Sequence, residues 1–199
     1  MGRPVILGVM GAGGDGAPPG SSTYALAEAL GEAVGRAGAL LLNGGGDGTM
    51  EASAIGARRA GGQVIGVLRA AVEEPSEEPP AGLDLALFTG LGDGRNFLNI
   101  SIADAVIALP GGAGTLSEIA LALKARKRFG KPVIALGAWQ FLIDRGYDLV
   151  RVDQPQDAVQ RAFAMLGLPL GDRIDAPIAF PEIPDQRGHR DRLRHFVSR

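Results

Sequence analysis

Cysteine is absent from the 199 residues of this chain. Its absence excludes disulfide bonds, thiolate nucleophiles and cysteine-bound metals. Histidine is almost as scarce, because both imidazoles, those of His189 and His195, lie within the last eleven residues. Chemistry in the main body must therefore use carboxylates, arginine, lysine, hydroxyls or backbone amides. We expect neither a metal site nor a bound cofactor.

The chain also lacks a strong charge imbalance and long hydrophobic runs. Its 20 Lys and Arg residues face 22 Asp and Glu residues, for a formal net charge of −2 at pH 7. We therefore expect no nucleic-acid partner, since such proteins usually carry a marked basic excess. No run of about 18 apolar residues suggests a membrane span, and the N-terminus shows no secretory leader pattern. These features predict a cytoplasmic protein without membrane contact.

Short apolar runs alternate along the chain with segments of helical periodicity. This alternation is typical of a parallel sheet covered on both faces by helices. We predict an α/β fold, a Rossmann-like doubly wound parallel sheet in three layers α/β/α, as a single domain over residues 1–176. Residues 73–80 are expected to form a solvated loop, and residues 177–199 an Arg-rich tail. The expected strands are 5–9, 39–42, 64–68, 83–88, 105–109, 132–136 and 149–152; the expected helices are 24–37, one ending near 61, 95–103, 115–128, 139–145 and 154–166.

The stretch from residue 105 to residue 118 carries the strongest functional signal. Residues 105–109 are an apolar run, typical of a strand buried on both faces. Pro110 ends this strand because proline has no N–H to donate. A glycine turn and a helix start follow, so unpaired amides and the positive end of a helix dipole point at one place, which suits phosphate. The predicted phosphate-binding residues are Gly111, Gly112, Gly114 and Thr115.

The loop after the first strand, residues 11–16, matches the G-x-G-x-x-G dinucleotide fingerprint in form. The match is weak, because prolines delay the next helix until about Ser22. The second strand also ends in Asn43 and glycines, where a ribose-binding acid is expected. Two interpretations stay open: a flexible loop over the sheet edge, or phosphate and ribose contacts from Gly13, Gly14 or Ser22.

A second glycine turn, residues 43–48, follows the second strand. Gly44, Gly45 and Gly46 exceed what a helix cap needs, and bare glycines suit close approach of the backbone to a ligand. Packing is the alternative reason for them. Asp47 and Thr49 are candidate N-caps of the next helix. Because ligands of such sheets bind beyond the carboxyl ends of the strands, we expect all these turns on one rim.

Two charged side chains accompany the glycine turns. Arg95 follows the fourth predicted strand, where a guanidinium can grip a phosphate with two parallel hydrogen bonds. Glu118 lies three residues after Thr115. One interpretation makes Glu118 the acid of a capping box, S/T-x-x-E, with a purely structural role. The other makes it a carboxylate that acts on the ligand.

These residues carry a resemblance to a known family. Residues 110–118, PGGAGTLSE, resemble the P-G-G-x-G-T-x-x-E signature of the LOG family in the SLOG superfamily, cytokinin riboside 5′-monophosphate phosphoribohydrolases. Residues 44–50, GGGDGTM, resemble its upstream G-G-x-x-G-x-M element. Arg95 and Glu118 stand where the family places its catalytic arginine and glutamate. The resemblance covers about residues 4–168.

The resemblance implies hydrolysis of the bond between base and ribose in a nucleoside 5′-monophosphate. Glu118 would stabilise the positive charge that develops on the ribose ring. Arg95 would hold the substrate, while the amides of Gly112, Gly114 and Thr115 cradle the 5′-phosphate. Members of the family are commonly dimers, so the resemblance also implies a homodimer or a higher homo-oligomer.

The chain departs from the family pattern in ways that support an alternative. Asn96 follows Arg95, where the family usually has lysine, and residues 115–124 are closer to a sister branch that includes molybdenum cofactor carrier proteins. The alternative function is a non-catalytic carrier or sensor of a phosphorylated pterin or nucleotide. A kinase or NTPase is not expected, because the chain has no G-x-x-x-x-G-K-[ST] loop.

Overall fold

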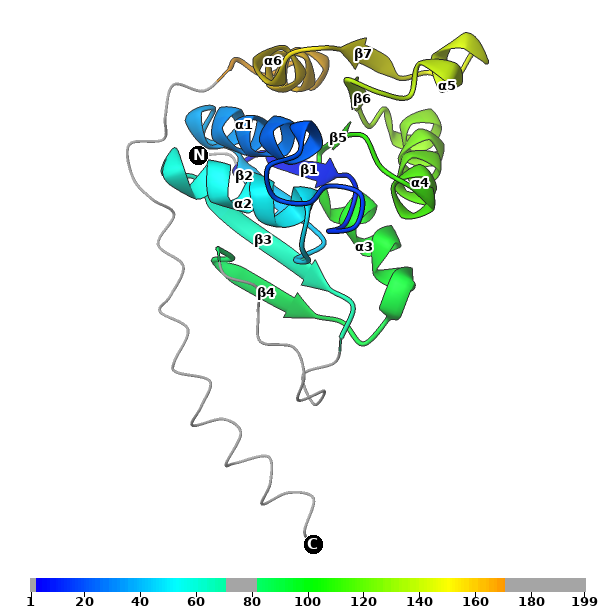
Figure 1. Cartoon of the computed structure of the whole chain (residues 1–199). Helices are drawn as coiled ribbons and strands as arrows, with labels where there is room; N and C mark the ends of the chain where they lie inside the picture. The colour runs from blue at the N-terminus through cyan, green and yellow to red at the C-terminus, as the bar shows by residue number, and fades with distance from the viewer. Residues whose placement is uncertain (1–2, 71–81, 171–199) are drawn as a thin grey trace, which may run out of the picture.

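The computed structural model describes residues 3–70 and 82–170. Within these ranges, seven parallel strands form one sheet in the order β4-β3-β2-β1-β5-β6-β7 (Figure 1). The doubly wound parallel sheet is thus confirmed. The strands are β1 (Ile6–Met10), β2 (Leu40–Asn43), β3 (Gln63–Leu68), β4 (Leu85–Phe88), β5 (Ala105–Ala108), β6 (Val133–Leu136) and β7 (Val150–Val152). The helices are α1 (Ser22–Arg36), α2 (Thr49–Arg59), α3 (Arg95–Ile102), α4 (Ala113–Phe129), α5 (Gln140–Asp144) and α6 (Pro155–Met165), with a short turn η1 (Gly92–Gly94) before α3.

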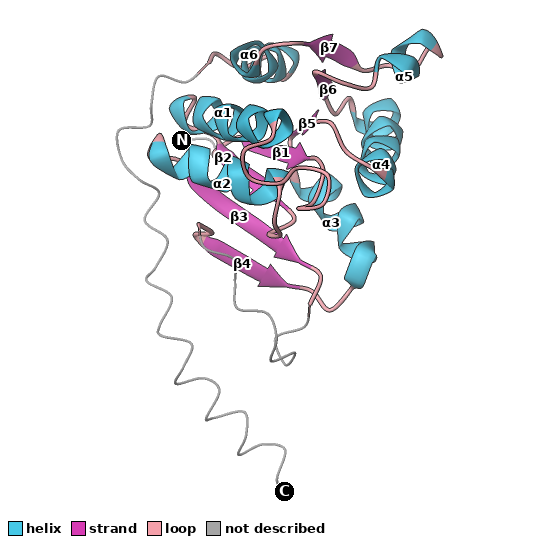
Figure 2. Ribbon diagram, viewed as in Figure 1, coloured by secondary structure: helices cyan, strands magenta, loops and turns pink. Residues whose placement is uncertain are grey.

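Helices cover both faces of the sheet, as Figure 2 shows. Side chains alternate along each strand, so Leu41 of β2 packs toward α1, α2 and α6, whereas its neighbours Leu40 and Leu42 pack toward α3, α4 and α5. Each face therefore has its own apolar core, and the three-layer α/β/α prediction is confirmed. Residues 73–80 and 177–199, predicted as a loop and a tail, lie outside the described residues. No helix in the described ranges is both long and apolar enough to cross a membrane.

The pairing of β1 with β5 brings two glycine turns together at the centre of the sheet. The two strands run in register, with Met10 opposite Ala108. Beyond the strands, the amide of Ala12 donates to the carbonyl oxygen of Pro110 at 3.1 Å, and the amide of Thr49 donates to the carbonyl oxygen of Ala12 at 3.0 Å. Three turns are thus tied together where the strand order reverses, the usual ligand position in such sheets.

The expected elements are present, with shifts of one or two residues at several ends. The largest consequence concerns α4, which begins at Ala113 and not at the expected Thr115. Gly112 is its N-cap and has extended backbone, with φ −99° and ψ −152°. Glycine is accepted at this position because the N-cap lies outside the helical region of backbone conformation. The helix therefore starts inside the glycine turn.

The crossing of α1 and α2 depends on two glycines. A methyl group at Gly31 would overlap the backbone carbonyl of Ser53, and one at Gly56 would overlap the carbonyl of Glu28. The two backbones therefore approach more closely than any larger residue allows. This crossing positions α2, whose first residue, Thr49, joins the glycine turns.

We expect Gly31→Ala to destabilise the protein, although alanine in a helix interior normally gains about 1 kcal/mol over glycine. The reason is the overlap with Ser53, and overpacking of this kind costs typically about 1–3 kcal/mol. The matched control is Gly114→Ala, since a methyl group there would meet none of the described residues within 4 Å. Urea unfolding of both variants measures the effect. Equal stability of the two variants would contradict the tight crossing.

Candidate functional site

A cavity of about 270 Å³ opens beyond the carboxyl ends of β1, β2 and β5. Its wall combines the glycine turns with the first turns of α3 and α4. The cavity therefore lies where the sequence predicted a ligand rim. Its lining residues are Val9, Met10, Gly11, Ala12, Gly13, Gly44, Asp47, Met50, Arg69, Asp93, Arg95, Asn96, Gly112, Gly114, Thr115 and Glu118.

The start of α4 presents bare amides to this cavity. The amide of Leu116 donates to the carbonyl oxygen of Gly112 at 3.0 Å and closes the first turn of the helix. The amides of Ala113, Gly114 and Thr115 precede this turn and have no acceptor within the helix. Within residues 3–70 and 82–170, no side chain caps them, and a methyl group at Gly112 or Gly114 would meet nothing within 4 Å. This helix end is thus open to an anion.

Gly111 and Thr115 hold the turn in shape. Thr115 is buried, with 3% of its surface exposed, and its hydroxyl lies so close to Gly111 that any side chain there would overlap it. The same position approaches the amide of Ala12. Gly111 itself does not line the cavity, whereas Thr115 does. Gly111 is explained by packing, and Thr115 combines packing with a free amide.

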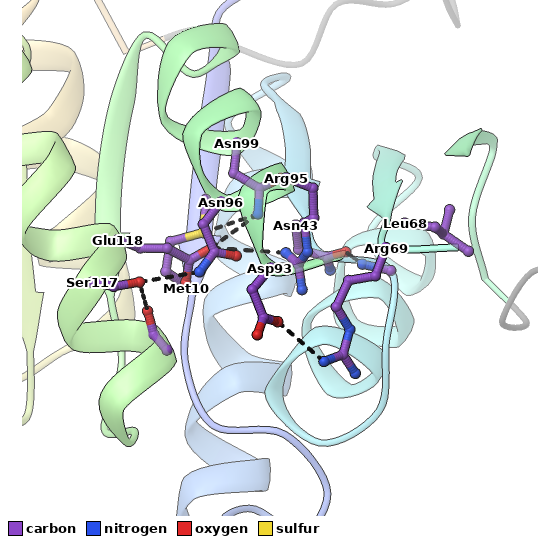
Figure 3. A network of polar contacts seen from close by, with 12 residues as sticks. Met10, Asn43, Leu68, Arg69, Asp93, Arg95, Asn96, Asn99, Ser117 and Glu118 are labelled. Carbon is purple, nitrogen blue, oxygen red and sulfur yellow. Dashed lines mark hydrogen bonds and ion pairs between the residues drawn. The ribbon is translucent and has the colours of Figure 1, made fainter. Parts of the chain in front are cut away.

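Arg95 and Glu118 face each other across the cavity wall (Figure 3). Arg95 is the first residue of α3, and its Nη1 lies 3.8 Å from Oε1 of Glu118. Both residues are buried, with 8% and 6% of their surfaces exposed. Burial lowers the pKa of Arg95 and raises the pKa of Glu118, and the attraction between the two charges opposes both shifts.

Glu118 does not act in a capping box. Thr115 is the third residue of α4 and not its N-cap, so Glu118 lies beyond the first turn. Its Oε1 instead accepts a hydrogen bond from Nδ2 of Asn99 in α3, at 3.0 Å. The capping-box interpretation of Glu118 is therefore wrong, because the helix starts earlier than the sequence suggested.

The second glycine turn contributes one wall of the cavity. Gly44 lies against the Arg95 guanidinium, which any side chain there would overlap. The amide of Gly45 donates to Oδ1 of Asn43 at 2.8 Å, and Gly45 packs on Leu68 with a φ of +64°. Neither Gly45 nor Gly46, which packs on Met50, lines the cavity. The structure thus brings Gly44 alone of the three to the cavity.

Neither candidate N-cap of α2 caps that helix. Its N-cap is Gly48, a residue without a side chain. Asp47 instead accepts a hydrogen bond from the amide of Gly14 at 2.9 Å, and the Thr49 hydroxyl donates to the carbonyl oxygen of Ala12 at 2.9 Å. Both side chains therefore connect the second glycine turn to the first.

The early loop brings one of its three candidate residues to the cavity. Gly13 lines it. The amide of Gly14 is occupied by Asp47. Ser22 is exposed as the first residue of α1, directly after the N-cap Ser21, whose hydroxyl accepts from the amide of Tyr24 at 3.1 Å. Gly14 and Ser22 do not line the cavity.

Sequence reasoning missed several side chains of the site. Arg69, which follows β3, pairs with Asp93 of η1 at 3.3 Å at the exposed side of the cavity. Asn99 lies behind Glu118. Arg69 could have been found from its place directly after a strand, at the carboxyl end, whereas Asn99 gave no signal beyond its spacing of four from Arg95. Within the described ranges, no three His, Cys, Asp or Glu side chains gather as a metal site would require.

The raised pKa of Glu118 makes a prediction about stability and pH. The shift already includes the attraction of Arg95, so the ionised carboxylate costs folding free energy at neutral pH. This cost disappears as the pH falls through the folded-state pKa toward the usual value of 4.5. We expect Glu118→Gln to be more stable than the parent at pH 7, with a difference that shrinks over this window.

Urea unfolding from pH 4 to pH 8 measures that difference. The control is Asp15→Asn, which changes an exposed carboxylate in the loop after β1. A Glu118→Gln variant that is less stable than the parent at pH 7 would show that the pairing with Arg95 outweighs the burial of the charge.

Comparison with known proteins supports the resemblance to the SLOG superfamily. An uncharacterized protein of Archaeoglobus fulgidus is 38% identical over 134 residues, which are 65% of this chain and 82% of that protein. The molybdenum cofactor binding protein of the phototrophic bacterium Rippkaea orientalis superposes with a TM-score of 0.72 and 32% identity, over 83% of this chain and 99% of that one. The molybdenum cofactor carrier protein of Chlamydomonas reinhardtii gives a TM-score of 0.70 and 32% identity over the same shares. The sequence model of the SLOG cluster4 family matches residues 4–159, and the chain therefore belongs to that family.

Proposed function

We propose that this protein binds the phosphate-bearing end of a small heterocyclic ligand in the cavity at the start of α4. One observation carries the proposal: Gly114 and Thr115, whose amides have no acceptor within the helix, line the same cavity as the buried Arg95. Oriented amides and an arginine are a common combination for phosphate. The ligand is a small molecule rather than a nucleic acid, because the chain carries no basic excess.

The cavity charges favour a ligand with one anionic end. Arg95 and Arg69 both line it, and the positive end of the α4 dipole adds to them. Glu118 lies beside Arg95, so a phosphate near the amides would leave an uncharged or electron-poor part of the ligand for the carboxylate. Such a ligand is a nucleoside 5′-monophosphate or a phosphorylated pterin.

Cleavage of the base from a nucleoside 5′-monophosphate is the fate that the side-chain geometry supports. The C1′–N bond breaks, a water oxygen bonds to C1′, and the leaving nitrogen takes a proton. Glu118 would stabilise the positive charge on the ribose and orient the water. The observation that supports cleavage is that the Glu118 carboxylate lines the cavity and does not cap α4.

Carriage without cleavage is the fate that the comparisons support. Two similar structures are named for binding or carrying molybdenum cofactor, which is a phosphorylated pterin. Asn96 also favours this function, because its side chain donates to the hydroxyl of Ser117 at 3.1 Å and ties α3 to α4. A lysine there would instead add a positive charge to the cavity lining.

Ligand binding is tested first, by calorimetry with AMP and with molybdenum cofactor. Arg95→Met removes the guanidinium, and Gly44→Ala displaces it without changing the charge. We expect each variant to lose about tenfold to a hundredfold in affinity for the ligand that binds, since hydrogen bonds to charged groups contribute about 1.5–3 kcal/mol. Arg36→Met, an exposed residue of α1, is the control. Unchanged affinity in both Arg95→Met and Gly44→Ala would contradict the proposed binding site.

Cleavage is tested with a panel of nucleoside 5′-monophosphates, measuring free base and ribose 5-phosphate. If the protein is a hydrolase, Glu118→Gln lowers turnover by about a hundredfold or more, while AMP still binds. Parental turnover in the Glu118→Gln variant would remove Glu118 from the reaction. Tight binding of molybdenum cofactor, with no product from any nucleotide, would establish the carrier instead.

We also propose that the chain forms a homodimer or a higher homo-oligomer through the face that α3 and α4 share. A groove of about 540 Å³ lies there between the two helices. Two large aromatic side chains at this groove are exposed, Phe97 by 61% and Phe129 by 73%. Lys124 and Arg128 flank them, so the groove combines an apolar floor with a charged rim, as interfaces between proteins do.

Phe129→Glu should shift the protein toward the monomer, because a charge would replace an exposed aromatic surface at this groove. Sedimentation of the full chain measures the state. Phe141→Glu is the matched control, as an aromatic residue of α5 that is 51% exposed outside the groove. A parent protein that sediments as a monomer, or an oligomer that only Phe141→Glu disrupts, would contradict this interface.

A further inference from the structure

Asn99 is a buried polar residue that the proposed chemistry does not use. It lies one helical turn after Arg95 on α3 and has no exposed surface. Its Nδ2 donates to Oε1 of Glu118 at 3.0 Å and approaches the sulfur of Met10 at 3.8 Å (Figure 3). We propose that Asn99 is a positioning residue, which fixes the orientation of the Glu118 carboxylate and stabilises its charged form in the cavity wall. The inference rests on the proposed function only where it assumes that the Glu118 carboxylate acts on a ligand.

The contact fixes which oxygen of Glu118 is available. Asn99 and Arg95 both approach Oε1. Within the described part of the chain, Oε2 receives no hydrogen bond and is the oxygen left for a ligand or a water. The Asn99 amide is also oriented, because turning it over would place its own oxygen against Oε1. Asn99 therefore acts through Glu118, without touching the cavity itself.

Asn99 is a closer partner of Glu118 than Arg95 is. Its donor lies at 3.0 Å, within hydrogen-bonding range, whereas the nearest Arg95 nitrogen is 3.8 Å away. Burial raises the pKa of Glu118, and the Asn99 hydrogen bond opposes this rise more than Arg95 does. The other charged groups of the cavity are Arg69, Asp93 and Asp47. Among the described residues, none of the three pairs with Glu118.

The position is costly in a way that a structural role does not explain. Oδ1 of Asn99 is buried and, among the described residues, has no hydrogen-bond donor. An unsatisfied buried acceptor is destabilising, and an apolar side chain of similar size would avoid it. Nε of Arg95, one turn away, is likewise buried without an acceptor within the described ranges. Asn99 and Arg95 thus hold buried polar atoms at positions where apolar side chains would give a more stable protein.

The wild-type protein supplies the first test, through the carboxyl carbon resonance of Glu118 and the side-chain amide resonances of Asn99. We expect the Asn99 amide to titrate with the same midpoint as Glu118, because its hydrogen bond changes when the carboxylate takes a proton. An Asn99 amide that does not respond to the titration of Glu118 would overturn the proposal, whether or not any variant folds.

The second test compares Asn99→Leu with Ser101→Ala. Leucine removes the donor at similar size, and we expect the titration midpoint of Glu118 to rise by about one pH unit or more. Ser101 lies on the same helix with its hydroxyl donating to the Phe97 carbonyl, away from Glu118, so its variant should leave the midpoint unchanged. A parental midpoint in a folded Asn99→Leu variant would overturn the proposal.

The titration separates this inference from the proposed function. If the protein cleaves nucleotides, the acid limb of its pH profile moves in Asn99→Leu by the same amount as the Glu118 midpoint. If it neither binds nor cleaves them, the proposed function fails while the titration still decides the role of Asn99.

Discussion

The site depends on the junction between the ends of β1 and β5. There the amide of Ala12 bonds to the carbonyl of Pro110, and the carbonyl of Ala12 accepts from both the amide and the hydroxyl of Thr49. These bonds lock three glycine turns around one point at the reversal of the strand order. Without side chains in the turns, backbone atoms can approach both one another and a ligand. This arrangement places the three turns on the cavity.

The buried charged pair Arg95 and Glu118 costs folding free energy. Taking a carboxylate and a guanidinium out of water is costly, and a separation of 3.8 Å repays only part of the cost. The protein nevertheless places Arg95 against the bare backbone of Gly44 and supports Glu118 from behind through Asn99. Polar groups kept at such cost in a cavity wall are typical of a functional site.

The layered sheet was predictable because its signal is long and repeated. Apolar runs such as residues 105–109 that alternate with helices form a parallel sheet between two helical layers. Because the strands are parallel, the loops after them lie at one edge of the sheet, where ligands bind. Single residues were less predictable. Gly45 and Gly111 carry the same sequence signal as Gly44 and Gly112, yet only Gly44 and Gly112 of these four line the cavity. A glycine that lines a cavity and a glycine that packs within the protein look alike in a sequence.

The role of Glu118 shows why the remainder needed three dimensions. The sequence places the start of α4 two residues too late, because N-cap positions depend on backbone angles. With the observed start, Glu118 lies beyond the first turn and belongs to the cavity wall instead of a capping box. The partner of this carboxylate, Asn99, comes from another helix and had no local signal. Contacts between α3 and α4 are set by tertiary packing, which a sequence motif does not contain.

The central claim is that the start of α4 receives phosphate, and an NMR titration of the ¹⁵N-labelled protein with ribose 5-phosphate tests it most directly. We expect the amides of Ala113, Gly114 and Thr115 to shift together with the Arg95 guanidinium along one binding curve. Binding that leaves these amides unmoved, with the shifts elsewhere in the chain, would contradict it.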